Sequence, residues 1–376
     1  MGICSATSLS YLDWGERIKK GLLGTRAPLQ ATLEITSRCN VRCVHCYITR
    51  CATEPNSREL SFHEYRDIID QMAEAGCLWV VFTGGEPLSR RDFLDIYGYA
   101  KKKGFIIVLF TNATLVTPEI ADYLHQYRPK SVEVSLYGAT KETYERVTGV
   151  PGSYERCIRG IELLAERGIP LYLKAMALTI NRHEINDIQK YAQKIGAQFR
   201  YDPVTWPQVN GVKDPLRVRL EPEEIIRLEM EDEERPKAWR EFGEKFLYRV
   251  DSEFLYWCGV GVHSFFIDSF GKLSLCVESR KPAYDLRQGT FADAWERFLP
   301  SVKSTRCTKD YVCRHCDLVN LCGRCPPFSE QENGDPESPV EFLCRLAHLR
   351  KEAFGLKLAP DQGALQTPLS APDNPT

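Results

Sequence analysis

The sequence of 376 residues lacks an excess of charge of either sign. Its 49 lysine and arginine residues nearly balance 51 aspartate and glutamate residues, which leaves a formal net charge of −2 at pH 7. Proteins that bind nucleic acid or anionic membrane surfaces by charge are clearly basic. The charge balance therefore argues against both classes, and we expect neither nucleic acid nor a membrane as a partner.

Long apolar segments are also missing. No apolar run approaches the ~18 residues that could span a bilayer, although hydrophobic residues make up 43% of the chain and suffice for a large core. Residues 1–20 lack the basic segment followed by an apolar run that marks a secretory signal. We therefore expect a cytoplasmic protein with a catalytic domain and a second, smaller domain.

Cysteine, in contrast, is abundant, with 15 residues in the chain. In a reducing compartment, clustered cysteines bind metal or do chemistry more often than they form disulfides. A first group consists of Cys39, Cys43 and Cys46. A second group follows much later in the chain: Cys258, Cys276, Cys307, Cys313, Cys316, Cys322, Cys325 and Cys344. The scattered cysteines are predicted to be small buried hydrophobic residues: Cys4, Cys51, Cys77 and Cys157.

Between the two cysteine groups, strand-like and helix-like segments alternate. The predicted strands are residues 29–36, 78–83, 105–111, 131–137, 170–179 and 197–204. The predicted helices between them are residues 61–76, 91–104, 117–127, 153–168 and 183–196. This alternation predicts a parallel sheet. Six such units form either a doubly wound sheet or a partial barrel, and periodicity alone leaves both open.

The remaining segments differ in composition from this array. Residues 1–29 form an N-terminal arm, and residues 206–257 are strongly charged and predict linker helices. Residues 258–350 are rich in cysteine and short turns, which predicts a separate metal-binding domain. Residues 351–376 carry proline, glycine and polar residues without periodicity, which predicts a disordered tail. The catalytic domain is accordingly expected at residues 30–205.

Polar groups follow four consecutive predicted strands. They are the cysteines of residues 39–46, the segment TGGEPL at residues 83–88, Thr111-Asn112 and Ser135. Because the carboxyl ends of parallel strands meet at one edge, these groups should line a common site.

Three thiolates on one short loop can hold three corners of a [4Fe–4S] cluster and leave the fourth iron open. The alternative is a zinc ion with His45 as fourth ligand, although the adjacent positions of His45 and Cys46 strain tetrahedral closure. In the next loop, Gly84 and Gly85 let the backbone approach a ligand closely, and Glu86 supplies a carboxylate for an ammonium group. Taken alone, that loop could equally be an ordinary strand-to-helix turn.

The spacing Cys39-x3-Cys43-x2-Cys46, followed one unit later by Gly-Gly-Glu-Pro at residues 84–87, resembles the radical S-adenosylmethionine (SAM) superfamily. The resemblance covers residues 30–205 and implies a partial (β/α)6 TIM-type barrel. It implies that the three cysteines hold a [4Fe–4S] cluster whose open iron is chelated by SAM. By the same resemblance, SAM is contacted by His45, Tyr47, Gly84, Gly85, Glu86, Asn112, Ser135 and Arg146.

His45 stands just before the third cysteine, where the family commonly has an aromatic residue, and its ring can also stack against adenine. Two of these assignments have alternatives. Arg146 suits a carboxylate, which a guanidinium binds bidentately, but it could equally be an exposed helix residue. Asn112 could instead cap a turn.

The second cysteine group resembles the SPASM extension of the same superfamily. Its pattern is Cys258-x12-Gly-x4-Cys276, then Cys-x2-Cys-x5-Cys-x2-Cys over residues 313–325, then Cys344. A pair of zinc ribbons is the alternative. The resemblance implies two auxiliary [4Fe–4S] clusters, one on Cys258, Cys276 and Cys325, and one on Cys313, Cys316, Cys322 and Cys344. The first lacks a fourth ligand, which is either Cys307 or a position left open for substrate.

The resemblance implies an enzyme that reductively cleaves SAM to a 5′-deoxyadenosyl radical and removes a hydrogen atom from a peptide or protein substrate. We expect a maturase of a ribosomally synthesised peptide, with a flavodoxin or ferredoxin as electron donor. Only about 29 residues precede the first strand, so a separate leader-binding protein is expected as well.

Three other functions remain open. The first is the maturation of a sulfatase. Relatives with that function place an aspartate directly after the cysteine equivalent to Cys276, where this chain has Val277, and this difference argues against it. A second enzyme class modifies tetrapyrrole or haem precursors. The third is electron transfer by a non-catalytic iron–sulfur or zinc protein. The Gly-Gly-Glu-Pro segment argues against this function, because an electron-transfer protein needs no SAM site.

Overall fold

The structure is a computed structural model that describes residue 18 and residues 21–22, 24–48, 59–247 and 252–357. Cys4, Cys51, most of the predicted N-terminal arm and most of the predicted tail lie outside these residues. In the described parts of the chain, none of the helices is long and apolar enough to cross a membrane.

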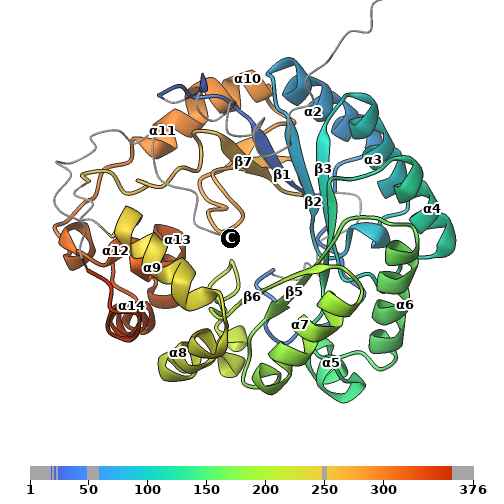
Figure 1. Cartoon of the computed structure of the whole chain (residues 1–376). Coiled ribbons are helices and arrows are strands. Elements are labelled where there is room, and N and C mark those ends of the chain that lie inside the picture. The colour runs from blue at the N-terminus through green and yellow to red at the C-terminus, as the bar shows by residue number, and fades with distance from the viewer. Residues whose placement is uncertain (1–17, 19–20, 23, 49–58, 248–251, 358–376) are drawn as a thin grey trace, which may run out of the picture.

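Six parallel strands form the first part of the sheet and pair in chain order. Figure 1 shows that they curve into an open barrel wall whose outer side is covered by helices. The fold is therefore a partial TIM-type barrel, as predicted, because a doubly wound sheet carries helices on both faces. The strands are β1 (Gln30–Glu34), β2 (Trp79–Thr83), β3 (Ile106–Thr111), β4 (Ser131–Ser135), β5 (Leu171–Met176) and β6 (Gln198–Asp202).

Five of the six outer helices agree with the predicted segments to within a few residues, and the sixth, α5 (Lys141–Thr148), corresponds to none of the predicted helical ranges. At the start of α4, the Thr117 hydroxyl accepts a hydrogen bond from the Ile120 amide (3.3 Å) and Pro118 occupies the first turn, as such a helix start requires. The helices are α2 (Phe62–Glu74), α3 (Phe93–Lys102), α4 (Pro118–Gln126), α5 (Lys141–Thr148), α6 (Ser153–Glu166) and α7 (Ile185–Lys194). Short 3-10 turns are η2 (Pro87–Ser89), η3 (Arg182–Glu184) and η4 (Asp214–Val218).

The cysteine-rich region begins by extending the barrel sheet. Strand β7 (Ser264–Ile267) pairs in parallel with β1, and β8 (Lys272–Ser274) and β9 (Tyr284–Asp285) follow antiparallel. The sheet thus has the order β6-β5-β4-β3-β2-β1-β7-β8-β9. The sequence did not indicate this pairing, because β7 lies more than 200 residues after β1 in the chain.

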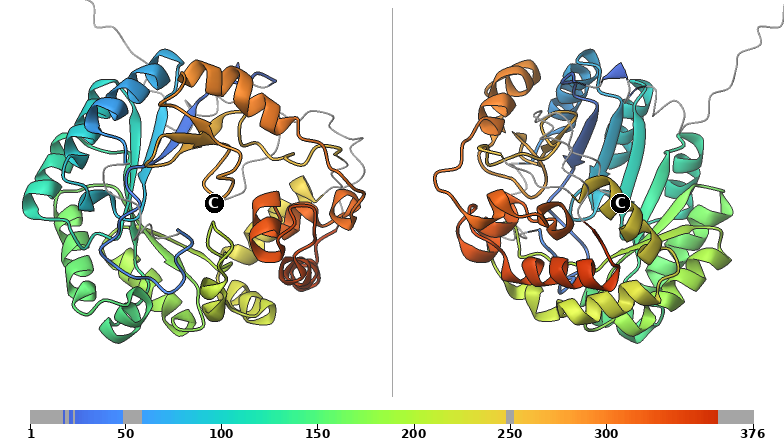
Figure 2. Two further views of the ribbon diagram at one scale, coloured as in Figure 1. Left: turned by 180° about the vertical axis from the view of Figure 1, so that it is seen from behind. Right: turned by 60° about the vertical axis from the view of Figure 1, so that its left-hand side comes forward.

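The remaining helices complete the ring that the barrel wall begins, as Figure 1 and the two views of Figure 2 show. The charged linker forms two helices, as predicted: α8 (Pro222–Glu231) and α9 (Arg235–Phe246). The later helical segments are α10 (Phe291–Asp293), the π-helix η5 (Ala294–Phe298), α11 (Leu299–Lys303), η6 (Val312–His315), α12 (Val319–Cys322), α13 (Pro326–Asn333) and α14 (Glu341–Ala353).

Side chains alternate between the two faces of the barrel wall. Outward-facing positions are apolar and fully buried under the helices, and include Leu33, Phe82, Leu109, Val134 and Leu173. Since successive strand residues point to opposite faces, the neighbouring positions point inward. Some of these inward positions are apolar, among them Val81, Val108, Phe110 and Met176. Others are polar or charged: Glu34, Thr83, Glu133, Lys174, Arg200 and Asp202. We refer to the space that these polar and charged side chains line as the polar interior.

A buried ion pair joins the C-terminal helix to the linker. The Arg350 guanidinium on α14 donates to both carboxylate oxygens of Glu229 on α8, at 3.1 and 2.6 Å. It also lies 4.3 Å above the ring of Trp239 on α9. Glu229 is fully buried and Arg350 is 6% exposed.

We predict that Glu229→Ala lowers the free energy of unfolding by about 3–5 kcal/mol, because it leaves a buried guanidinium without its partner. The double variant Glu229→Leu/Arg350→Met should recover most of this loss. Urea unfolding of the metal-free protein measures both. The exposed pair Lys141–Glu155 provides the control, and Glu155→Ala should leave the midpoint unchanged. Equal losses in the single and double variants would contradict the prediction.

Candidate functional site

The first three cysteines lie on the loop after β1 and surround a common space. The hydroxyl of Tyr137 is the best marker of this space, because the charges of Cys39, Cys43 and Cys46 all act on it. Burial, followed by the nearby Cys43 thiol, holds the pKa of Tyr137 well above its usual range. Tyr137 also forms an edge-on ring contact with His45, with centroids 4.5 Å apart. The sequence analysis did not identify Tyr137.

Backbone and side-chain hydrogen bonds hold this loop from two sides. The Arg42 amide donates to the Thr148 carbonyl (2.7 Å) and the Val44 amide donates to the Val147 carbonyl (3.0 Å), both at the end of α5. From the other side, the Asn112 amide group contacts the Cys39 thiol at 3.8 Å and donates to the side-chain oxygen of Asn40 at 2.9 Å. Asn112 therefore positions the cysteine loop.

The Gly-Gly-Glu-Pro loop packs directly on the cysteine loop. The Gly85 amide donates to the Thr36 carbonyl and the Glu86 amide donates to the Arg38 carbonyl, both at 2.8 Å. A Cβ atom at Gly84 would lie 2.4 Å from the Thr36 carbonyl oxygen, and one at Gly85 would lie 2.2 Å from that of Arg38. The closest approach that these glycines allow is thus to the cysteine loop.

The Glu86 side chain lies between the ends of β2 and β3. Its fully buried carboxylate accepts hydrogen bonds from the Thr111 hydroxyl (2.8 Å) and from the Asn112 and Leu88 amides (2.7 and 3.0 Å). Burial raises the pKa of Glu86 to about 7, against these hydrogen bonds. The carboxylate holds the two strand ends together, which the sequence did not indicate.

The other predicted SAM contacts have different surroundings. His45 is 7% exposed, its Nδ1 atom has no hydrogen-bond partner in the described structure, and burial lowers its pKa to about 4. Ser135 ends β4 on the inner side, and its hydroxyl interacts with Tyr137. Tyr47 follows the third cysteine and faces the polar interior, where the charge of Glu278 acts on it. Arg146, in contrast, is exposed on α5.

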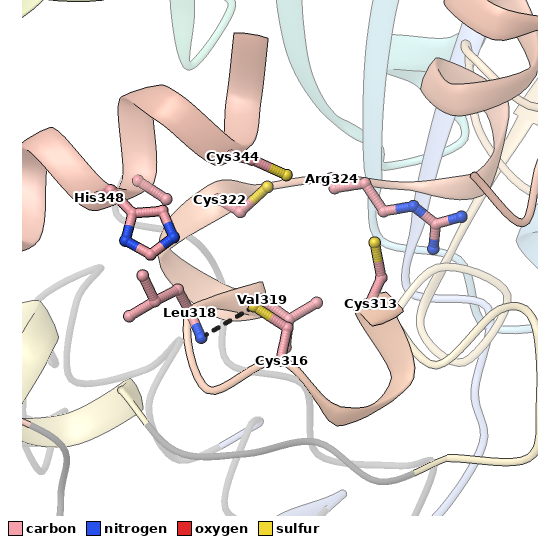
Figure 3. Close-up of a pocket in the computed structure, with 9 residues that line it drawn as sticks. Cys313, Cys316, Leu318, Val319, Cys322, Arg324, Cys344 and His348 are labelled. Carbon is pink, nitrogen blue, oxygen red and sulfur yellow. Dashed lines mark hydrogen bonds between the residues drawn. The ribbon is translucent and has the colours of Figure 1, made fainter. Parts of the chain in front are cut away.

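Four of the later cysteines line a pocket of about 40 Å³. Figure 3 shows Cys313, Cys316, Cys322 and Cys344 around it, with the thiols of Cys322 and Cys344 side by side. A hydrogen bond from the Cys322 thiol lowers the pKa of Cys344. This set matches the predicted ligands of the second auxiliary cluster.

Three further cysteines form a separate group. The charge of Cys258 acts on Cys276, and the charges of both act on Cys325. Burial raises the pKa of Cys276 to about 12. Cys307 instead lies among Tyr311, Glu337, Arg314 and Arg324, on the side of the four-thiol pocket.

The structure thus brings the later cysteines together as one group of four and one group of three. Among the residues that the structure describes, no three His, Cys, Asp or Glu side chains are arranged around one metal-ion position. Sets of three and four thiols are the donors that hold four-iron clusters.

The polar interior contains ion pairs that sequence reasoning missed. The Arg280 guanidinium bonds the Glu34 carboxylate at 2.6 Å, and Lys174 and Arg200 both bond Glu133, at 3.1 and 2.6 Å. A signal was present, because charged residues at alternate positions of apolar strands mark an inner polar face.

Comparisons with known proteins agree with this geometry. Residues 33–194 match the Radical SAM superfamily. The AdoMet-dependent heme synthase of Methanosarcina barkeri is 36% identical over 46% of this chain and 49% of its own length. That of Oleidesulfovibrio alaskensis is 26% identical over 86% of this chain and 89% of its own length.

Peptide maturases are similar as well. The mycofactocin maturase MftC of Mycobacterium tuberculosis is 32% identical over 49% of this chain and 46% of its own length. This chain thus spans about half the length of that maturase and of the Methanosarcina protein. The structure of Streptococcus suis SuiB bound to the precursor peptide SuiA has the same fold, with a TM-score of 0.67, 18% identity and coverage of 92% of this chain and 83% of SuiB.

We predict that Gly85→Ala disrupts the cysteine loop, because the added methyl would collide with the Arg38 carbonyl and the Cys39 side chain. Iron bound after anaerobic reconstitution should fall by about four atoms per chain. Gly21→Ala is the matched control, since no atom lies within 4 Å of its added methyl, and it should keep the full iron content. Full iron in Gly85→Ala would show that the two loops are not packed together.

Proposed function

Since this chain belongs to the radical SAM superfamily and is a radical SAM enzyme, we propose that it removes a hydrogen atom from a peptide or protein substrate, as the maturase of a ribosomally synthesised peptide. When bound, a [4Fe–4S] cluster supplies the electron that cleaves SAM to methionine and a 5′-deoxyadenosyl radical. The protein binds and orients the reactants and excludes water.

The proposed cluster ligands are Cys39, Cys43 and Cys46. Support comes from their convergence beside Tyr137. The proposed SAM contacts are Gly84, Gly85 and Glu86 at the amino group, Tyr47 and His45 at the adenine, and Asn112, Ser135 and Arg146 elsewhere on the molecule. The unpartnered Nδ1 atom of His45 leaves a ring edge that can accept a hydrogen bond.

The charge balance of the interior carries the choice of substrate. Each of three inward cations is bonded to a carboxylate: Lys174 and Arg200 to Glu133, and Arg280 to Glu34. Two further carboxylates, Asp202 and Glu278, lie close enough to interact. A tetrapyrrole precursor carries several carboxylates, which this lining would repel, whereas a peptide offers N–H groups that carboxylates accept. The lining therefore supports a peptide or protein substrate.

Modification of a haem precursor is the second candidate. The observation in its favour is that AdoMet-dependent heme synthases match this chain over nearly its whole length, at 26% identity. Proteins that are 26% identical can act on different substrates, and the paired cations in the interior argue that the substrate of this chain is not a haem precursor.

The later cysteines are proposed to hold two auxiliary clusters. Cys313, Cys316, Cys322 and Cys344 supply four ligands to one, and Cys258, Cys276 and Cys325 supply three to the other. The fourth position of the latter is proposed to be open, because Cys307 lies beside Tyr311 and away from the three. A flavodoxin or ferredoxin is the proposed electron donor, and a separate leader-binding protein the proposed partner.

We predict that the reconstituted protein converts SAM to 5′-deoxyadenosine in the presence of dithionite, and that Cys43→Ala abolishes this conversion. Chromatography of the products measures it, and Cys157→Ala, at a buried cysteine outside the three groups, should retain activity. Addition of candidate substrates then separates the two functions. A peptide encoded near the gene should increase the rate of 5′-deoxyadenosine formation and should itself lose hydrogen. If only an iron porphyrin increases this rate, the haem-precursor reaction is favoured.

We predict about twelve iron atoms per chain, which corresponds to three four-iron clusters. Replacing Cys39, Cys43 and Cys46 by alanine should remove about a third of this iron. Cys307→Ala should retain all of this iron, because Cys307 belongs neither to the group Cys39, Cys43 and Cys46 nor to the group Cys258, Cys276 and Cys325. Elemental analysis measures the iron and zinc bound per chain. Iron near four per chain with zinc in the remaining sites would overturn the auxiliary-cluster assignment.

A further inference from the structure

We propose that Asp202, Glu278 and Gln331 form an acceptor wall that binds an ammonium or guanidinium group of the substrate. The proposal rests on the proposed function and adds to it the chemistry by which the substrate is selected. A lysine or arginine side chain, or the amino terminus of a peptide, would satisfy it.

The three residues come from distant segments that meet at the interior. Asp202 ends β6 on its inner face, in register with Met176 of β5. Glu278 lies two residues after Cys276, and the charge of Asp202 acts on it. Gln331 is on α13, and its side chain interacts with Glu278. Asp202 and Gln331 therefore both lie near Glu278 in the polar interior.

Two acceptor atoms of this wall are buried without a partner. They are Oε2 of Glu278 and Oε1 of Gln331, in the described structure. Gln331 is only 7% exposed, and its amide nitrogen is fixed by donation to the Glu278 carbonyl at 3.1 Å. A side-chain hydrogen bond from Gln331 also acts on the Glu278 carboxylate, so the acceptors of the wall left without a partner among the described residues are the two atoms Oε2 of Glu278 and Oε1 of Gln331. Because buried acceptors in folded proteins are nearly always paired, these two atoms indicate that a donor from outside the chain completes them.

Four cations act on the wall: Arg280 on Glu278, and Arg235, Arg350 and Lys174 on Asp202. Each of them is bonded to a carboxylate outside the wall, which is Glu34 for Arg280, Glu133 for Lys174 and Glu229 for Arg235 and Arg350. The Arg280 guanidinium is bonded to the Glu34 carboxylate (2.6 Å) and to the Val277 carbonyl (3.1 Å). Asp202 uses one carboxylate oxygen for the Val204 amide (2.8 Å) and is otherwise exposed toward the interior. Carboxylate and amide oxygens accept hydrogen bonds, and cationic donors form the strongest ones with carboxylates. A substrate carboxylate would meet charge of its own sign.

The position of the wall suits substrate selection. Glu278 acts electrostatically on Tyr47, which follows Cys46, and also on Cys276 and Cys325. It thus lies between the first cysteine loop and the three-thiol group. A cation held here would fix the substrate backbone across the interior and present neighbouring carbon atoms to the SAM site.

The experiment uses three small probes of equal chain length on the reconstituted full-length protein with SAM bound. They are n-butylguanidinium, n-butylammonium and butyrate, and saturation-transfer NMR titrations give their affinities. We expect both cations to bind at least about tenfold more tightly than butyrate, since hydrogen bonds between charged groups dominate the contact. Glu278→Gln and Asp202→Asn should each lower cation affinity by about tenfold. Glu330→Gln, an exposed position on the same helix as Gln331, should change nothing.

Equal binding of butyrate and the cations, or unchanged cation affinity in both variants, would overturn the proposal. If Glu278→Gln fails to fold or loses iron, Asp202→Asn decides alone, because its carboxylate is exposed and its replacement keeps the hydrogen bond to Val204. Production of 5′-deoxyadenosine is measured on the same samples. Its absence would reject the proposed function, while the probe affinities still report on the wall.

Discussion

The site depends on two hydrogen bonds between neighbouring loops, from the Gly85 and Glu86 amides to the Thr36 and Arg38 carbonyls. Residues 35–48, the described part of the cysteine loop, contain no helix or strand, so their shape depends on contacts with neighbouring segments. Both glycines lack the Cβ atom that would prevent this approach. The Glu-Pro half of the motif then anchors the loop to the next strand, because the buried Glu86 carboxylate accepts from the Thr111 hydroxyl and the Asn112 amide. The Asn112 side chain in turn contacts the Cys39 thiol, so the end of β3 is linked back to the cysteine loop.

This arrangement explains how much of the site could be predicted. The sequence indicated the strands, five of the six outer helices, a helical linker and the loops at the strand ends, since each depends on local periodicity or spacing. Periodicity left a doubly wound sheet and a partial barrel open, and the resemblance to the superfamily decided between them. The sequence did not indicate Tyr137, the ion pairs of the interior or the pairing of β7 with β1, because these depend on contacts between segments far apart in the chain. Glu86 was expected to face SAM, and its bonds to Thr111 and Asn112 appear only when β2 and β3 lie side by side. Arg146 was selected for its chemistry, and its exposure on α5 agrees with the alternative of an exposed helix residue.

The alternation of side chains along the strands determines the chemistry of the inner face of the barrel. Outward positions are apolar because helices cover them, and the strict alternation of a strand leaves the inward positions free to vary. Here they carry charges that pair with one another, such as Glu133 with Lys174 and Arg200. Such pairs hold these side chains in place, and the single carboxylate of Glu133 serves two cations. The charge of the inner face is thus set by the residues between the core positions.

Both the barrel sheet and the linker hold the cysteine-rich region in place. Its first part is attached to the barrel through β7 against β1, and its last helix, α14, is attached to the linker helix α8 through the Arg350–Glu229 pair. A region held at one end only would let its thiols move relative to the first cysteine loop. With both ends fixed, Cys276 follows directly from the added strands and Cys344 from the docked helix. Substitutions at either attachment should therefore alter the width of the interior even though they lie away from every thiol.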